Sequence, residues 1–232
     1  MKQVSPEKMS LAWFKLAEFV IRGEKERALS IYRLLAHSIQ SAALVAQLEG
    51  DIFLAFNDER AFDSYRRAGW LYQQSGDDVQ AIFTYECLCD LADRADDVLM
   101  ILISLYQKRK DEKKILITAR RILSSLINQE RFSDAHDLLL TVPLASVLAA
   151  ELHEKLVLAL LGPNTGKHEQ KNIQSHIAAA LDGYFLDTDQ QRSRERVAHL
   201  LSTVAALDDV AHAYACGFVK TVRMDYTKEC VL

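Results

Sequence analysis

Two carboxylate–histidine pairs near the C-terminus are the residues of this sequence best suited to metal chemistry. Glu195 precedes His199 by four positions and Asp208 precedes His212 by four, so each pair shares one face of a helix. A helical dimetal site needs two Glu-x-x-His motifs and further inward carboxylates, and neither these nor the His-Glu-x-x-His motif of metalloproteases occurs in the sequence. We therefore predict no metal site and no cofactor. A metal-dependent active site on a helical bundle stays open as the alternative.

A glycine-containing stretch, "LLGPNTGKHE" at residues 160–169, is a candidate phosphate-binding loop. A P-loop has four residues between its glycines and a Ser or Thr after the lysine. Here three residues separate Gly162 from Gly166, and His168 follows Lys167. Because the preceding residues have helical periodicity, the stretch predicts a helix-ending turn. We assign residues 162–172 to a linker and regard it as a candidate hinge.

Nucleophilic catalysis has no recognisable residues in this chain. There is no Gly-x-Ser-x-Gly elbow, and nothing beside the four cysteines, Cys87, Cys89, Cys216 and Cys230, marks one as a nucleophile. Their spacing forms no disulfide framework, which predicts free thiols in a reducing cytoplasm. Charged residues interrupt the N-terminal apolar stretch, and the longest uncharged runs are too short to span a bilayer. We expect a cytoplasmic protein that is not an enzyme and does not bind a membrane.

The charge balance argues against nucleic acid as a partner. The chain has 28 basic and 32 acidic residues and a formal net charge of −4, so it has no chain-wide basic field. A local basic cluster, "QKRKDEKK" at residues 107–114, could bind acidic peptides or RNA phosphates. We favour its interpretation as a helix end followed by a turn, where Lys and Arg favour the helix dipole and solubility.

Composition and periodicity predict helices as the elements that carry these residues. Half of the 232 residues are hydrophobic, and eight glycines and three prolines are too few for the turns of a many-stranded sandwich. Small residues are followed four and seven positions later by bulky ones, as in Ala28/Tyr32/Leu35 and Ala81/Tyr85/Leu88. The pattern recurs at intervals of 33 to 35 residues, which indicates a stack of helical hairpins.

In "RRAGWLYQQSGDDVQAIFTYECL", residues 66–88, the chain resembles the tetratricopeptide repeats. The motif places are filled by Gly69, Tyr72, Gly76-Asp77, Ala81, Tyr85 and Leu88. Gly69 and Ala81 suit a close helix crossing, Gly76 suits the positive φ that ends a helix, and Asp77 suits the cap of the next. Looser matches elsewhere extend the resemblance from about Leu11 to Pro143. Gly23, Ala28 and Tyr32 match in one hairpin, and Gly50, Phe53, Asn57, Ala61 and Tyr65 match in another.

The resemblance implies a right-handed α-solenoid of about ten to twelve helices. Residues 1–161 would form the repeats, and residues 173–232 would form helices that continue or cap the stack. Such proteins hold a partner peptide or helix in a concave groove lined by the first helix of each hairpin. If Gly69 lies on a first helix, the groove residues are Asp63, Arg66, Trp70 and Gln73, together with Gln47 and Asp51 from the preceding unit.

The predicted partner is another protein. Arg66, Trp70 and Gln73 share a helix face, and Trp and Arg are frequent anchors at interfaces. The paired lysines and asparagines with which the family's best-known subtype grips a C-terminal carboxylate are absent from these places. Two alternatives stay open for a scaffold of this kind: a subunit of a larger assembly or homo-oligomer, and a regulator whose C-terminal helices mask the groove.

Overall fold

The computed structural model describes residues 6–91, 96–142, 144–162 and 170–230, and these form α-helices, one 3-10 helix and no strand. The prediction of an all-α fold with consecutive helices packed in pairs is confirmed. The right-handed twist of the stack stays a prediction. The chain divides into two compact units, Met1–Leu105 and Tyr106–Leu232 (unit 1 and unit 2).

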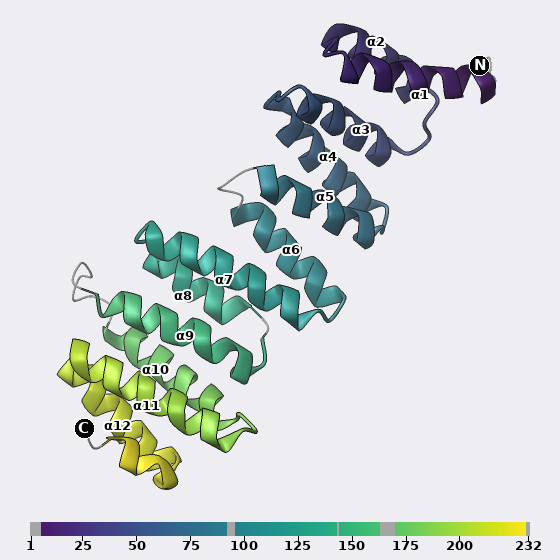
Figure 1. Ribbon diagram of the computed structural model, residues 1–232. Helices are drawn as coiled ribbons and strands as arrows, with labels where there is room; N and C mark the ends of the chain where they lie inside the picture. Colours follow the sequence, from purple (N-terminus) through teal and green to yellow (C-terminus); the bar gives the residue numbers. More distant parts are fainter. Residues whose placement is uncertain (1–5, 92–95, 143, 163–169, 231–232) are drawn as a thin grey trace. The chain divides into compact units, whose positions relative to one another are not determined.

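Unit 1 consists of helical hairpins whose helices alternate between two layers (Figure 1). Its helices are α1 (Pro6–Ile21), α2 (Lys25–Ala36), α3 (Ala42–Ala55), α4 (Arg60–Gln74), α5 (Asp78–Leu91) and most of α6 (Asp96–Lys108). The most extensive packing in this unit joins α3 to α4, whereas α2 and α3 touch only lightly. This contrast indicates that α3 and α4 form one hairpin.

Unit 2 continues the same construction. It contains α7 (Glu112–Asn128), α8 (Phe132–Thr141), α9 (Ser146–Leu160), α10 (Gln170–Phe185), α11 (Gln190–Leu207), α12 (Asp209–Val222) and the 3-10 helix η2 (Met224–Cys230). Asp208 separates α11, which ends at Leu207, from α12, which begins at Asp209. The Asp208 carboxylate accepts a hydrogen bond of 2.6 Å from the Ala211 amide and so caps α12.

The predicted linker at residues 162–172 lies mostly outside the described residues, as do Pro143 and His168. The helices on either side of it, α9 and α10, pack extensively against each other within unit 2. The hinge therefore stays a prediction.

The turns that end the helices repeat one backbone design. At five of them a residue in the left-handed region is followed by an amide that bonds to the carbonyl five residues earlier, as in the Schellman motif. The left-handed residues are Gly23, Asn57, Gly76, Lys110 and Glu130, with φ between 49° and 78°. Gly23 and Asn57 are 34 residues apart, as are Gly76 and Lys110. The repeat expected from the sequence is thus visible in the backbone.

Acidic residues after these turns begin the next helices. Asp77 accepts a hydrogen bond of 3.1 Å from the Gln80 amide, and Asp111 accepts one of 3.1 Å from the Lys114 amide. Each carboxylate satisfies a backbone N–H that has no partner within the helix. The capping role expected for Asp77 is confirmed.

Close contacts between small residues and tyrosines hold the hairpins of unit 1 together. A Cβ atom added to Gly69 would lie 2.6 Å from Cε1 of Tyr85, and one added to Gly50 would lie 3.1 Å from the Tyr65 ring. Ala81 of α5 is fully buried. The packing roles predicted for Gly69 and Ala81 agree with these positions, because a larger side chain would displace the tyrosine.

Two helices also approach closely at a glycine in unit 2, and the sequence analysis did not predict this contact. A Cβ atom added to Gly183 of α10 would lie 2.3 Å from the Ser146 carbonyl oxygen of α9. Because that obstacle is backbone, it cannot rotate away as a side chain can. Gly183 therefore sets how closely α9 and α10 pack.

We predict that Gly69→Ala lowers the free energy of unfolding by about 1–3 kcal/mol. The Tyr85 ring is 1% exposed, and its hydroxyl is fixed to Gln73, so it has little room to shift. Gly217→Ala in α12 is the matched control, since no atom lies within 4 Å of its added Cβ. Urea denaturation followed by circular dichroism measures both. Equal stability of Gly69→Ala and wild type would contradict the assigned packing role.

Candidate functional site

Four of the six predicted groove residues, Asp63, Arg66, Trp70 and Gln73, lie along one face of α4. Trp70 is 55% exposed and so is not part of the core. The Arg66 guanidinium forms an ion pair with Asp97 at the start of α6, in the same unit. The face thus presents an indole beside a paired arginine, a combination suited to contact with another protein.

The remaining two, Gln47 and Asp51, lie one turn apart on α3, and each accepts a hydrogen bond from a buried tyrosine of α4. The Tyr72 hydroxyl donates to Gln47 over 2.7 Å, and the Tyr65 hydroxyl donates to Asp51 over 2.6 Å. On α4, Gln73 likewise accepts a bond of 2.9 Å from Tyr85 of α5. Three of the six residues therefore satisfy core tyrosines. Because α3 and α4 are consecutive helices, the six residues come from both layers.

The surroundings of Asp51 change the pKa of its carboxyl group. Displacement of water by neighbouring protein atoms raises the pKa of Asp51, and the hydrogen bond from Tyr65 opposes the rise. The same contact and burial raise the pKa of the Tyr65 phenol, with burial as the larger cause. Asp51 is thus a carboxylate at the boundary between core and surface.

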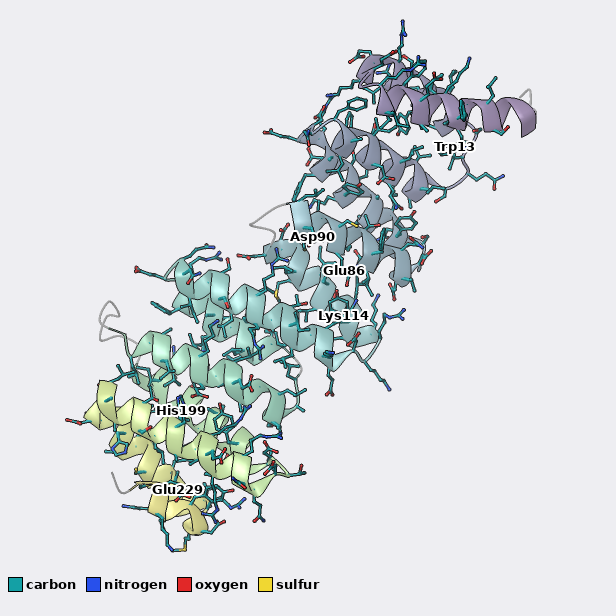
Figure 2. All side chains as sticks on the ribbon, in the orientation of Figure 1. Trp13, Glu86, Asp90, Lys114, His199 and Glu229 are labelled. Carbon is teal, nitrogen blue, oxygen red and sulfur yellow. The ribbon has the colours of Figure 1, made fainter. Side chains whose placement is uncertain are left out.

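Asp51 also lines a shallow apolar pocket of 270 Å³ between α1 and α3 that the sequence predictions missed. The other lining residues are Trp13, Leu16, Ala17, Val20, Leu48 and Ile52. Trp13, which Figure 2 labels, is 40% exposed. The helical spacing of Trp13, Leu16, Ala17 and Val20 was a usable signal for one apolar face of α1. Its pairing with α3 required the fold.

The carboxylate–histidine pairs suggested by the sequence do not form. Glu195 accepts a hydrogen bond from the Gln191 amide, whereas His199 lies 3.2 Å from Glu154 of α9. Asp208 caps α12, and His212 lies 3.4 Å from the sulfur of Cys216. Across the described residues, no three His, Cys, Asp or Glu side chains converge as a metal site. The four cysteines are free thiols.

A different group of histidines comes together in unit 2. His176 of α10 is 1% exposed and uses both ring nitrogens. Its Nε2 lies 2.9 Å from Nδ1 of His136 on α8, and its Nδ1 lies 2.8 Å from Nδ1 of His153 on α9. The neighbours engage different nitrogens, so the rings form a hydrogen-bonded chain and do not point at one common atom. No sequence spacing indicated this histidine chain.

Burial keeps His153 and His176 uncharged. It lowers the pKa of His153 to about 4, helped by the nearby His136. Burial also lowers the pKa of His176 to about 3, helped first by His153 and then by His136. The ordinary pKa of both side chains is 6.5. Below about pH 6.5 the unfolded chain therefore binds protons at these two histidines that the folded chain does not bind. Acid therefore favours the unfolded state of this region.

We predict that unit 2 loses up to about 3 kcal/mol of stability per pH unit between about pH 6 and 4. Each proton that only the unfolded chain binds lowers the free energy of unfolding by about 1.4 kcal/mol per pH unit, and two histidines are involved. Amide hydrogen exchange in α8, α9 and α10 measures this loss. His153→Asn keeps a polar atom near the Nδ1 position but does not titrate, so it should reduce the slope by about half. His37→Gln, on the exposed surface of unit 1, is the control. An unchanged slope in His153→Asn would contradict the role of the chain.

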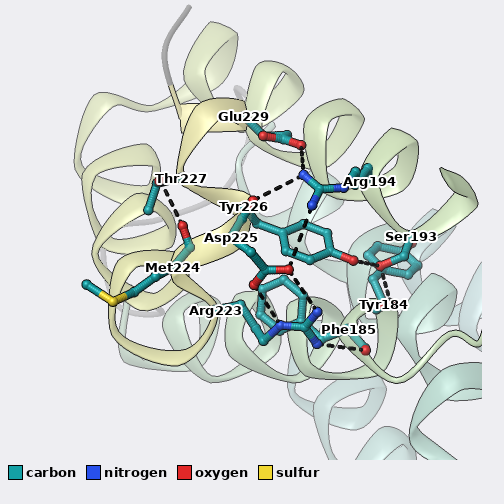
Figure 3. A network of polar contacts seen from close by, with 10 residues as sticks. All are labelled: Tyr184, Phe185, Ser193, Arg194, Arg223, Met224, Asp225, Tyr226, Thr227 and Glu229. Atoms are coloured by element: carbon teal, nitrogen blue, oxygen red, sulfur yellow. Dashed lines mark hydrogen bonds and ion pairs between the residues drawn. The ribbon is translucent and has the colours of Figure 1, made fainter. Parts of the chain in front are cut away.

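A network of polar contacts attaches η2 to the end of unit 2 (Figure 3). The Tyr226 hydroxyl lies 2.8 Å from the Ser193 hydroxyl, which donates a bond of 2.7 Å to the Tyr184 carbonyl. The guanidinium groups of Arg194 and Arg223 lie 4.6 and 4.9 Å from the centre of the Tyr226 ring. These contacts bury Tyr226 and cover the last helices, which gives the network a structural role.

We predict that Tyr226→Phe costs about 0.5–1.5 kcal/mol, since it removes one buried hydrogen bond and keeps the ring between the arginines. Thermal denaturation tests this cost, with Tyr214→Phe, a partly exposed tyrosine of α12, as the control. A loss no larger than that of the control would show that the hydroxyl contributes nothing.

The basic segment at residues 107–114 occupies a helix end and a turn. Lys110 has the left-handed conformation that ends α6, Asp111 caps α7, and the Lys114 ammonium lies 5.2 Å from the centre of the Tyr106 ring. These positions fit the helix-end interpretation of the segment.

Comparison with known proteins does not assign this chain to a family. No protein-family model matches the sequence, and no curated protein matches it either. None of the helices in the described ranges combines the length and apolar character needed to cross a membrane.

Proposed function

We propose that this protein is a non-enzymatic scaffold or adaptor that binds another protein through the helical surface of unit 1. The observation that carries the proposal is the exposure of aromatic side chains on three helices of unit 1. Trp13 and Phe14 on α1, Trp70 on α4 and Phe83 on α5 are 40%, 70%, 55% and 53% exposed. Exposed aromatic residues are enriched at protein interfaces, where they supply large contact area at low entropic cost.

The helical-repeat architecture supports this proposal. Stacked hairpins create long surfaces without needing a cavity, and the resemblance to tetratricopeptide repeats implies binding of a peptide or helix. In that resemblance, a groove would include the α4 face with Arg66 and Trp70. If α3 is instead a first helix, as its close pairing with α4 favours, the groove would include Gln47 and Asp51 on α3.

Affinity capture from native cell extract with the intact chain tests the proposal. We expect a protein retained by wild type to be lost with Arg66→Ala/Trp70→Ala if the α4 face is used, or with Trp13→Ala if the α1–α3 face is used. The Arg66–Asp97 pair is exposed, so Arg66→Ala should change the stability by less than about 1 kcal/mol. Should no form of the chain retain a protein, the proposed function is wrong.

One observation favours membership of a larger assembly as a second candidate function. Phe14 and Ile21 lie seven positions apart on α1, on one face, and are 70% and 85% exposed. Exposed apolar residues that gather on one helix face are typical of a contact surface. Sedimentation of the purified chain against a Phe14→Ser/Ile21→Ser variant would detect self-association through this face.

A further inference from the structure

The two layers of unit 1 differ in charge. Helices α3 and α5 carry acidic residues and no basic ones, namely Glu49, Asp51, Asp78, Glu86 and Asp90. Helices α2 and α4 are mainly basic: Lys25, Arg27, Arg33, Arg60, Arg66 and Arg67 stand against Glu26 and Asp63. The layer that contains α1, α3 and α5 is therefore the more acidic one (the acidic layer). Its charge comes from α3 and α5, since α1 carries Lys15 as well as Glu18. The first turn of α6 adds Asp96 and Asp97 outside these helices.

Part of this charge lies at the surface of the acidic layer. Glu49 forms an ion pair of 2.6 Å with Arg67 of α4 and so joins the two layers. Asp51 and Asp90 are exposed, and they come from α3 and α5. Burial raises the pKa of the Cys87 thiol on α5, and the negative charges of Asp90, Asp51 and Glu86 raise it further. Carboxylates of both helices therefore raise the pKa of the same thiol.

The apolar pocket between α1 and α3 (the Trp13 pocket) has one of these carboxylates, Asp51, in its lining. Its walls are apolar except for Asp51, and Trp13 of α1 faces Leu48 and Ile52 of α3 across it. At 270 Å³ the pocket is smaller than the clefts that usually hold cofactors or drug-sized ligands, which begin at about 300 Å³. A pocket of this size and lining suits one large apolar side chain of a partner.

We propose that the α1–α3–α5 face of unit 1 binds a basic amphipathic helix, which inserts an apolar side chain beside Trp13 and places a Lys or Arg against Asp51. The inference rests on the proposed function, because it specifies the chemistry of the partner. The acidic layer repels nucleic acid and anionic lipid, so a cationic protein segment is the complementary occupant. Apolar anchoring at a pocket and charges at its rim are the usual division of labour at interfaces.

A designed peptide provides the probe. It is a fluorescein-labelled helix of about 18 residues, built from Leu at i, i+3, i+4 and i+7 positions with Lys elsewhere. A peptide with Glu in place of Lys tests the charge, and a reordered Leu/Lys peptide of the same composition tests the need for an apolar face. Fluorescence anisotropy with the full-length chain at 50 and 300 mM salt measures the dissociation constants.

The chain supplies closely matched variants. Trp13→Ala removes the pocket wall, and Asp51→Asn removes the charge but keeps an oxygen that accepts the Tyr65 hydrogen bond. Trp70→Ala and Asp63→Asn make the same changes on the exposed face of α4, in the other layer. Circular dichroism of each variant shows whether it is folded before binding is compared.

We expect the Leu/Lys helix to bind wild type and the other two peptides to bind about tenfold more weakly. Trp13→Ala should weaken binding by about tenfold or more, and Asp51→Asn by about threefold. The two α4 variants should stay within about twofold of wild type, and affinity should fall with salt.

Two results would overturn the inference: no binding of the Leu/Lys helix to wild type, or equal losses in the Trp13 and Trp70 variants. The proposed function is judged separately by affinity capture. A captured partner that still binds Trp13→Ala and Asp51→Asn would leave the scaffold function standing and overturn this inference alone. Capture of no protein by any form would overturn the scaffold function itself.

Discussion

The contact between a glycine of one helix and a tyrosine of the next is the constraint on which unit 1 depends. Gly50 admits Tyr65 and Gly69 admits Tyr85, so the helix axes approach closely and the rings fill the space between them. A buried phenol also needs a hydrogen-bond acceptor. Asp51 and Gln73 supply it, and the packing of the core thereby fixes polar side chains at the surface.

This dependence changes how the candidate binding residues should be understood. Gln47, Asp51 and Gln73 serve the core first and are held in place by it, whereas Trp13 and Trp70 are exposed and contribute little to the core. Held polar groups beside exposed aromatic groups favour binding, because few rotamers must be ordered when a partner arrives. The difference in charge between the layers adds direction. Arg67 and Glu49 form an ion pair between the layers, whereas Asp90 is exposed on α5, and Asp51 is exposed on α3 while it also accepts the Tyr65 hydrogen bond.

Unit 2 uses a different polar device within the same construction. Three histidines from three helices satisfy one another in a place where a single imidazole would lack a partner. A protonated imidazole has no acceptor nitrogen, so these hydrogen bonds require that the accepting rings stay neutral. The packing of α8, α9 and α10 therefore depends on pH. In η2 of the same unit, Tyr226 lies between two arginines, Arg194 and Arg223.

The sequence by itself determined the helices, their turns and the small-residue contacts, because each depends on neighbours within a few positions. Gly76 and Asp77 encode a helix end and a cap locally, and Gly69 and Ala81 mark a crossing by their size. The tertiary structure alone decided which faces are exposed, that α1 and α3 enclose a pocket, and that His136, His153 and His176 meet. Those contacts join residues on different helices, and their geometry depends on packing distances and rotations that no periodicity in a single helix records.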